Sequence, residues 1–130
     1  MIFLDTNFLV SFFIEEEDDH DRAVEIAKNI VNEEQIISRL IIAETANLLH
    51  NKLKIDNERI KEIYKELNRD YTLIEDHYFY DKALDMMLNL NKRVQFFDCV
   101  FITIMKELGI KEIVTFDKHF ENIGGITTVN

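Results

Sequence analysis

The 130-residue chain has no proline, only three glycines and a single cysteine. Since proline and glycine mark most turns, their scarcity leads us to expect a largely helical chain. Cys99 alone cannot form an internal disulfide, and its apolar surroundings predict a buried thiol. No apolar run reaches the ~20 residues of a membrane helix, and the strand-like start at Met1 leaves no room for a signal peptide. We therefore expect one cytoplasmic domain over residues 1–130, with no membrane segment.

Basic residues are also few relative to acidic ones, so that the formal net charge is −10. This balance argues against a broad electrostatic attraction to nucleic acid or to an anionic membrane. Six of the 25 acids lie within residues 15–21, which is typical of a solvated loop and helix start. Acids that bind a divalent cation would lose their net repulsion. Net charge therefore does not decide the partner.

Short apolar runs alternate with amphipathic segments along the chain. Strands are expected at the start of the chain, ending before Asp5, and at Gln35–Ser38, 71–74, 112–116 and 126–129. Four helices are expected over 8–14, 40–53, 78–90 and Phe96–Leu108, and Ser38 is the expected cap of the second of these. Two further helices are expected to begin after a cap at Asp18 or Asp19 and after a cap at Asp56. Gly109 would end the last helix. This alternation predicts an α/β fold, a three-layer α/β/α arrangement with a central, mostly parallel twisted sheet of four to five strands.

Three of the expected helices have an apolar stripe at helical spacing, which predicts their buried face. These stripes are Ala23, Val24, Ile26, Ala27, Ile30 and Val31; then Ile60, Ile63, Tyr64 and Leu67; then Ala83, Leu84, Met87, Leu88 and Leu90.

Four acids occupy positions where the surrounding pattern favours an apolar residue: Asp5, Glu44, Asp98 and Asp117. Asp5 and Asp117 follow expected strands, and in open α/β sheets ligands bind at the carboxyl ends of the strands. Burying an isolated carboxylate is costly, and no basic residue near Glu44 or Asp98 in the sequence is an obvious partner. Carboxylates gathered at one edge repel one another unless they bind protons or a cation. Their hard oxygen atoms favour Mg²⁺ or Mn²⁺.

Each acid also has a simpler structural interpretation. Asp5 can cap a turn or helix, Asp98 can be a helix N-cap, and Asp117 can cap a short turn over 118–121. Glu44 can face solvent from a mostly buried helix. Spacing alone leaves both interpretations open, because nothing local ties the four acids together.

Several sequence segments together are similar to a known family. They are Leu4-Asp5-Thr6-Asn7, the approach from Asp19-His20 to Ala23, Ala43-Glu44, and the stretch from Asp98 through Gly109 to Val114-Thr115-Phe116-Asp117-Lys118-His119-Phe120. In these segments the chain resembles a PIN domain, the nuclease fold of the VapC-type toxins of bacterial and archaeal toxin–antitoxin pairs. The sequence departs from that pattern at Gln95, where a small polar residue is common, and at the bulky Val100, Phe101 and Ile102, where alanines are common.

The resemblance implies that Asp5, Glu44, Asp98 and Asp117 form the catalytic, metal-binding acids of a ribonuclease. Asp5, Asp98 and Asp117 would hold Mg²⁺ or Mn²⁺, and Glu44 would bind a second ion or orient the attacking water. Thr115 matches the family's Ser or Thr beside the last acid. Thr6 and Asn7 are further supporting candidates.

The resemblance also implies partners. The substrate would be RNA, with tRNA and other structured RNAs as candidates, and a cognate antitoxin protein would occupy the site. A homodimer is expected, with the outer side of the apolar helix at Phe8, Phe12 and Phe13 as one surface that can bury against a second copy. Phosphates can contact Arg39, Lys52, Lys54 and Arg93, although each is also an ordinary surface charge. The four histidines, at 20, 50, 77 and 119, show no metal-ligand spacing.

Two other functions stay open at this point. One is a catalytically silent PIN-fold module that binds RNA or protein. The other is a phosphatase with Asp5 as nucleophile, which usually has Asp-x-Asp after the first strand. The second position of that pattern is Asn7 here.

Overall fold

The computed structural model describes residues 1–130 and contains one five-stranded sheet in which every pairing is parallel. The strands are β1 (Ile2–Leu4), β2 (Gln35–Ser38), β3 (Thr72–Ile74), β4 (Glu112–Val114) and β5 (Thr127–Val129). They lie in the order β3-β2-β1-β4-β5. The first strand of the chain is therefore the central one, which explains why Ile2, Phe3 and Leu4 are all fully buried.

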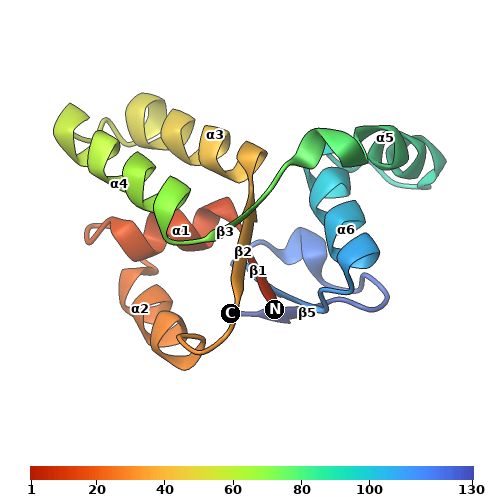
Figure 1. Ribbon diagram of the computed structural model, residues 1–130, viewed down its shortest axis with the longest axis horizontal. Helices are drawn as coiled ribbons and strands as arrows, with labels where there is room; N and C mark the ends of the chain where they lie inside the picture. The colour runs from red at the N-terminus through yellow and green to blue at the C-terminus, as the bar shows by residue number, and fades with distance from the viewer.

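Six α-helices cover this sheet: α1 (Thr6–Phe13), α2 (His20–Asn29), α3 (Arg39–Asn47), α4 (Asn57–Arg69), α5 (Tyr80–Asn89) and α6 (Phe96–Leu108). Figure 1 shows α1 to α4 on one side of the sheet and α5 and α6 on the other. The predicted three-layer α/β/α fold is therefore confirmed, and the sheet is parallel throughout.

Helix α6 follows its sequence pattern closely. It covers the predicted residues Phe96–Leu108, and Gly109 ends it in the left-handed conformation with φ of +70°. Seven consecutive side chains, Cys99 to Met105, are buried, and Cys99 is a free thiol within them. A helix that is apolar on nearly all sides is buried on nearly all sides.

Helix α3 is shorter than predicted and is capped differently. It ends at Asn47 and continues as a π-helical turn over Leu48–Lys52, whereas the apolar pattern predicted one helix over 40–53. Ser38 does stand at the N-cap position, but its buried hydroxyl has no hydrogen-bond partner. The carboxylate of Asp76 caps the helix instead, since it accepts a hydrogen bond of 2.7 Å from the N–H of Leu40.

The predicted buried face of α5 was largely wrong. Ala83 is buried, but Leu84, Leu88 and Leu90 are 44%, 70% and 39% exposed. The reason is that α5 packs mainly against α6, so that a single narrow stripe is covered. Two smaller corrections concern Val31, which lies beyond the end of α2 and is 68% exposed, and Tyr64, which lies beside the buried stripe of α4 and is 51% exposed.

The aromatic side chains of α1 are mostly covered within the chain itself. Phe8 and Phe13 are buried, and Phe8 packs near the ring of Phe116, with the ring centroids 6.3 Å apart. Only Phe12 keeps part of its surface, so that little of this helix is left for the second copy that the sequence suggested. No helix is long and apolar enough to span a membrane.

Candidate active site

The carboxyl ends of β1 and β4 define the centre of the candidate site. Leu4 and Val114 are partners in the parallel register, and the N–H of Asp5 donates to the carbonyl of Val114 at 3.0 Å. Asp5 and Thr115 therefore leave their strands side by side. Asp5 is the N-cap of α1, because its Oδ1 accepts a hydrogen bond of 2.8 Å from the N–H of Thr6. This edge of the sheet is where open α/β folds bind ligands.

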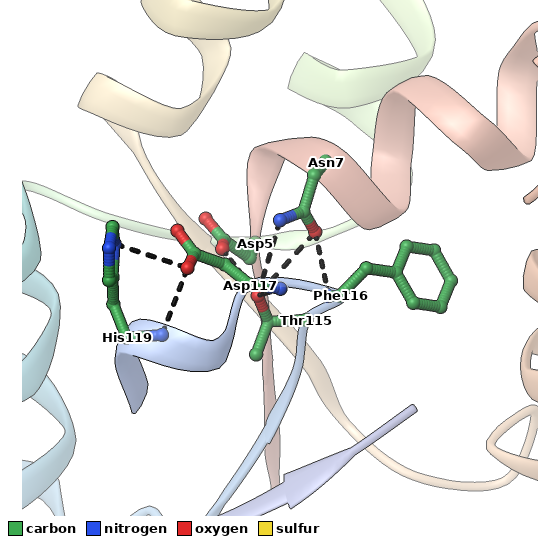
Figure 2. A network of polar contacts seen from close by, with 6 residues as sticks. All are labelled: Asp5, Asn7, Thr115, Phe116, Asp117 and His119. Atoms are coloured by element: carbon green, nitrogen blue, oxygen red, sulfur yellow. Dashed lines mark hydrogen bonds and ion pairs between the residues drawn. The ribbon is translucent and has the colours of Figure 1, made fainter. Parts of the chain in front are cut away.

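Thr115 connects three neighbouring residues through one buried hydroxyl (Figure 2). The hydroxyl donates to Oδ2 of Asp5 at 2.7 Å and accepts from the side-chain amide of Asn7 at 3.3 Å and from the N–H of Asp117 at 3.0 Å. One donor and two acceptor positions are all that a hydroxyl offers. Thr115 is therefore fully used in positioning Asp5 and Asp117.

Asn7 fixes the backbone directly before Asp117. Its side-chain oxygen accepts a hydrogen bond of 3.1 Å from the N–H of Phe116, while its amide group donates to Thr115. The start of α1 is thereby tied to the segment after β4 (Figure 2).

Asp117 lies where that segment turns. Its Oδ1 accepts a hydrogen bond of 2.9 Å from the N–H of His119 and lies 3.1 Å from Nδ1 of the same side chain. Asp117 thus caps the short 3₁₀ turn Lys118–Phe120, as the simpler interpretation predicted. Capping uses one carboxylate oxygen of Asp117, and each oxygen of Asp5 accepts one hydrogen bond. Because a carboxylate oxygen has two lone pairs, neither residue is excluded from ligand binding.

Glu44 and Asp98 reach the same region from helices on opposite sides of the sheet. Glu44, on α3, lies 3.4 Å from the hydroxyl of Thr6, which donates to it. Asp98 stands in the first turn of α6, whose N-cap is Gln95, so the N-cap interpretation of Asp98 is wrong. Neither carboxylate forms an ion pair with a Lys or Arg side chain.

The pKa values of Asp5, Glu44 and Asp98 show the effect of burial and of neighbouring carboxylates. Burial raises the pKa of Asp5, and the charge of Asp117 adds to that rise. Burial raises the pKa of Glu44 to about 7, with further contributions from the charges of Asp5 and Asp98. Burial likewise raises the pKa of Asp98 to about 6, and the charges of Asp5 and Asp117 add to it. Perturbed carboxyl groups of this kind concentrate at functional sites.

The chemistry of these side chains fits a divalent cation. Four carboxylates with no Lys or Arg partner are hard oxygen ligands in a region of uncompensated negative charge, and Mg²⁺ and Mn²⁺ bind such groups. No three of them are arranged as a ready-made ion-binding group. Binding would therefore require the side chains to turn toward a common centre.

One supporting residue was missed by the sequence analysis. Asp76 is a buried carboxylate, 4% exposed, that caps α3 and also accepts a hydrogen bond of 2.9 Å from the hydroxyl of Tyr80. It links the start of α5 to the helix that carries Glu44. Since its partner Leu40 lies 36 positions earlier, no local pattern could have revealed this contact.

These observations define the class of protein. It is a three-layer α/β/α protein with a parallel sheet and four acids at the carboxyl ends of the strands. Within that class, the chain belongs to the PIN domain family, whose model matches residues 2–126.

Similar proteins extend over nearly the whole chain. A VapC ribonuclease of Aquifex aeolicus is 28% identical over 133 residues, covering 100% of this chain and 96% of the relative. The structure of VapC20 from Mycobacterium tuberculosis, described as a toxin that cleaves the sarcin-ricin loop, matches with a TM-score of 0.78 at 18% identity over 95% of each chain. A toxin–antitoxin complex from Klebsiella pneumoniae matches with a TM-score of 0.68 at 14% identity, over 98% of this chain and 97% of the other.

Proposed function

We propose that this protein is an Mg²⁺- or Mn²⁺-dependent endoribonuclease that hydrolyses RNA phosphodiester bonds. The observation that carries the proposal is the group of four carboxylates from separate elements without a Lys or Arg partner, in which burial and neighbouring carboxylate charges raise the pKa values of Asp5, Glu44 and Asp98. Membership of the PIN family and the similarity to a VapC ribonuclease support the same activity.

Asp5, Asp98 and Asp117 would hold the cation. When bound, it supplies a water of lowered pKa and positive charge beside the phosphate. The Thr115 hydroxyl holds the carboxylate of Asp5 and the backbone N–H of Asp117, so that the side chain of Asp117 is left to turn toward the ion. Glu44, next to the Thr6 hydroxyl, would orient the attacking water or bind a second ion.

The partners follow from the same proposal. The substrate would be a structured RNA, such as tRNA or a ribosomal RNA loop, since exposed loops present unpaired nucleotides. The chain would act in the cytoplasm as the toxin of a type II pair, as a homodimer, with residues 1–130 as one nuclease domain. Its antitoxin would cover the carboxylates and block the site.

The test is cleavage of end-labelled structured RNA by the purified protein with Mg²⁺, with Mn²⁺ and with EDTA. Asp5→Asn and Asp98→Asn are assayed beside the wild type, because each keeps the side-chain shape and removes the charge. Cleavage that requires the metal and disappears in both variants is the expected result. Cleavage that survives both substitutions would exclude this site as the catalytic one.

A silent binding module is the alternative that the same assay separates. The absence of a ready-made ion-binding group is the observation in its favour. Metal binding without cleavage of any RNA tested would favour that alternative.

A further inference from the structure

A large groove begins at Asp98, one of the four site carboxylates, and does not include the other three. Its volume is about 1150 Å³, and its walls come from α6, the end of α5 with the following loop, and the segment after Asp117. Pockets for small ligands usually hold ~300–1,000 Å³. The groove is therefore large enough for a polymer segment that reaches the site.

The charge of this groove is opposite to that of the whole chain. Four basic side chains line it, namely Lys92, Arg93, Lys106 and Lys118, together with His119 and the acids Asp98 and Glu121. With histidine neutral, four positive and two negative charges leave the groove with +2, in a chain whose net charge is −10.

These four basic residues also have no carboxylate partner. Of the 15 Lys and Arg residues, seven form ion pairs: Arg22, Lys28, Arg39, Arg59, Lys61, Arg69 and Lys82. Eight remain, and four of those eight line this one groove. An unpaired cation is free to contact a phosphate, whereas a paired one must first give up its carboxylate.

The groove extends away from the candidate site along one face of α6. Asp98, Ile102 and Lys106 are spaced four residues apart and all line it, which places them on one helix face. Eight residues of α-helix span ~12 Å. The end of α5 adds apolar side chains to the lining, including Met86, Met87 and Leu90.

We propose that this groove binds a single-stranded RNA segment that flanks the scissile phosphate, with the four cations on phosphates and the aliphatic side chains against bases. Single-strand grooves combine cations that follow the backbone with side chains, mostly aromatic, on which bases stack, and in this groove methionine and leucine side chains would take that place. A duplex hides those faces and would leave the apolar wall unused. The inference rests on the proposed nuclease function, since it names the substrate strand of that same site.

The chain offers a matched control for the experiment. Replacing Lys92, Arg93, Lys106 and Lys118 by Gln changes the net charge from −10 to −14. Replacing the other four unpaired cations, Lys52, Lys54, Lys65 and Lys111, by Gln produces the same change elsewhere on the surface. Lys52 and Lys54 were candidates for phosphate contacts in the sequence, but neither lines the groove. All eight side chains are exposed, so that both variants should fold, which their thermal unfolding checks.

Binding is measured by fluorescence anisotropy with a labelled 12-nucleotide single-stranded RNA in EDTA, where metal-dependent cleavage cannot occur. We expect the groove variant to bind on the order of 10- to 100-fold more weakly and the control variant to change less than threefold. The slope of log affinity against log salt should fall by up to ~2.8 in the groove variant, about 0.7 for each lost phosphate contact.

Three results would overturn the proposal. An equal loss in both variants would show a general charge effect, and no loss in the groove variant would show that RNA binds elsewhere. Competition by a duplex of the same sequence as strongly as by the single strand would exclude single-strand recognition. If the groove variant keeps RNA binding but loses affinity for polyglutamate, the groove is a docking surface for an acidic protein.

The binding assay also separates this inference from the nuclease proposal. Suppose that the groove variant selectively loses RNA binding and the wild type cleaves no RNA with any metal tested. That result would support the groove as an RNA-binding site and exclude the nuclease activity. If the wild type cleaves RNA and the groove variant does so with an equal kcat/KM, the nuclease activity would be supported and the groove would be excluded as its RNA-binding site.

Discussion

Two acid-rich regions of this chain differ in almost every physical respect. Residues 15–21 hold six acids in seven positions, all exposed or partly exposed, and an exposed ion pair joins one of them, Asp19, to Arg22. The candidate site holds four acids from four separate elements, and Asp5 among them is 7% exposed. The density of acids in the sequence therefore says little about function. What marks the site is that four buried or partly buried carboxylates from separate elements come together without a Lys or Arg partner.

The largest expected difference between the two regions is in RNA cleavage. Asp117→Asn keeps an oxygen to cap the turn but removes one charge, and it should lower kcat/KM on the order of 10³-fold, or ~4 kcal/mol, because a metal ligand is lost. Changing all six acids of residues 15–21 to their amides removes six charges, which takes the net charge from −10 to −4, and should alter kcat/KM only a few-fold. Initial rates of cleavage of end-labelled RNA provide the measurement. Similar losses in both proteins would contradict the distinction between the two regions.

The second largest effect concerns the hydroxyl that connects the site. Thr115→Val keeps the shape of the side chain but leaves Asp5, Asn7 and the N–H of Asp117 without their shared partner. An unsatisfied buried polar group costs ~1–3 kcal/mol, so urea denaturation should give a correspondingly lower free energy of unfolding. Thr115→Ser retains the hydroxyl and serves as the control for that comparison. A Val variant as stable as the Ser variant would show that the hydrogen bonds contribute nothing.

A smaller effect is expected in the pH dependence of stability without metal. Burial and neighbouring charges raise the pKa of Glu44 from 4.5 to about 7 and that of Asp98 from 3.8 to about 6. The folded state therefore binds these protons more tightly than the unfolded state. This stabilisation is complete below the unfolded pKa values and is lost as the pH rises through the folded ones, between about 6 and 7.

The expected observation is a metal-free Tm that falls by a few degrees between pH 5.5 and pH 8, since ~1 kcal/mol moves the Tm of a domain of this size by roughly 4 °C. The double variant Glu44→Gln with Asp98→Asn lacks both titrating groups and should show a flatter profile over the same range, by differential scanning fluorimetry in EDTA. Parallel profiles of the wild type and the double variant would contradict the assigned cause.

The smallest effect is expected at the solvated acids. Glu16→Gln and Asp18→Asn should each change the free energy of unfolding by less than ~0.5 kcal/mol, because exposed charges without a fixed partner contribute little. Adding Mg²⁺ should raise the Tm of these variants as much as that of the wild type. If either variant lost the Mg²⁺ effect, the cation would bind among residues 15–21 and not at the candidate site.

How far the sequence predicted the structure depended on where the stabilising contacts lie. The Gln35–Ser38 strand and the Phe96–Leu108 helix were predicted to the residue, because their apolar runs and flanking residues are local signals. The exposed Leu88 of α5 was missed, since periodicity cannot tell a helix that packs on one neighbour from one that lies on a sheet. The cap supplied by Asp76 was missed because it joins residues far apart in sequence.

The features of the candidate site also differ in how far the sequence could predict them. The four acids could be chosen from their unusual positions and from the family resemblance, and the structure brings them to one edge of the sheet. The connecting role of the Thr115 hydroxyl and the unpaired cations beside Asp98 depend on the three-dimensional arrangement of β1, β4 and α6. No pattern of neighbouring residues contains that information.

Titration with Mn²⁺, monitored by electron paramagnetic resonance, tests whether Asp5, Glu44, Asp98 and Asp117 together bind divalent cations. The protein should bind Mn²⁺ in competition with Mg²⁺. Asp5→Asn, Asp98→Asn and Asp117→Asn should each weaken binding more than tenfold, and Glu44→Gln should also weaken it, while Asp18→Asn leaves it unchanged. Mn²⁺ binding that stays as tight in Asp5→Asn and Asp98→Asn as in the wild type would exclude these carboxylates as the cation site.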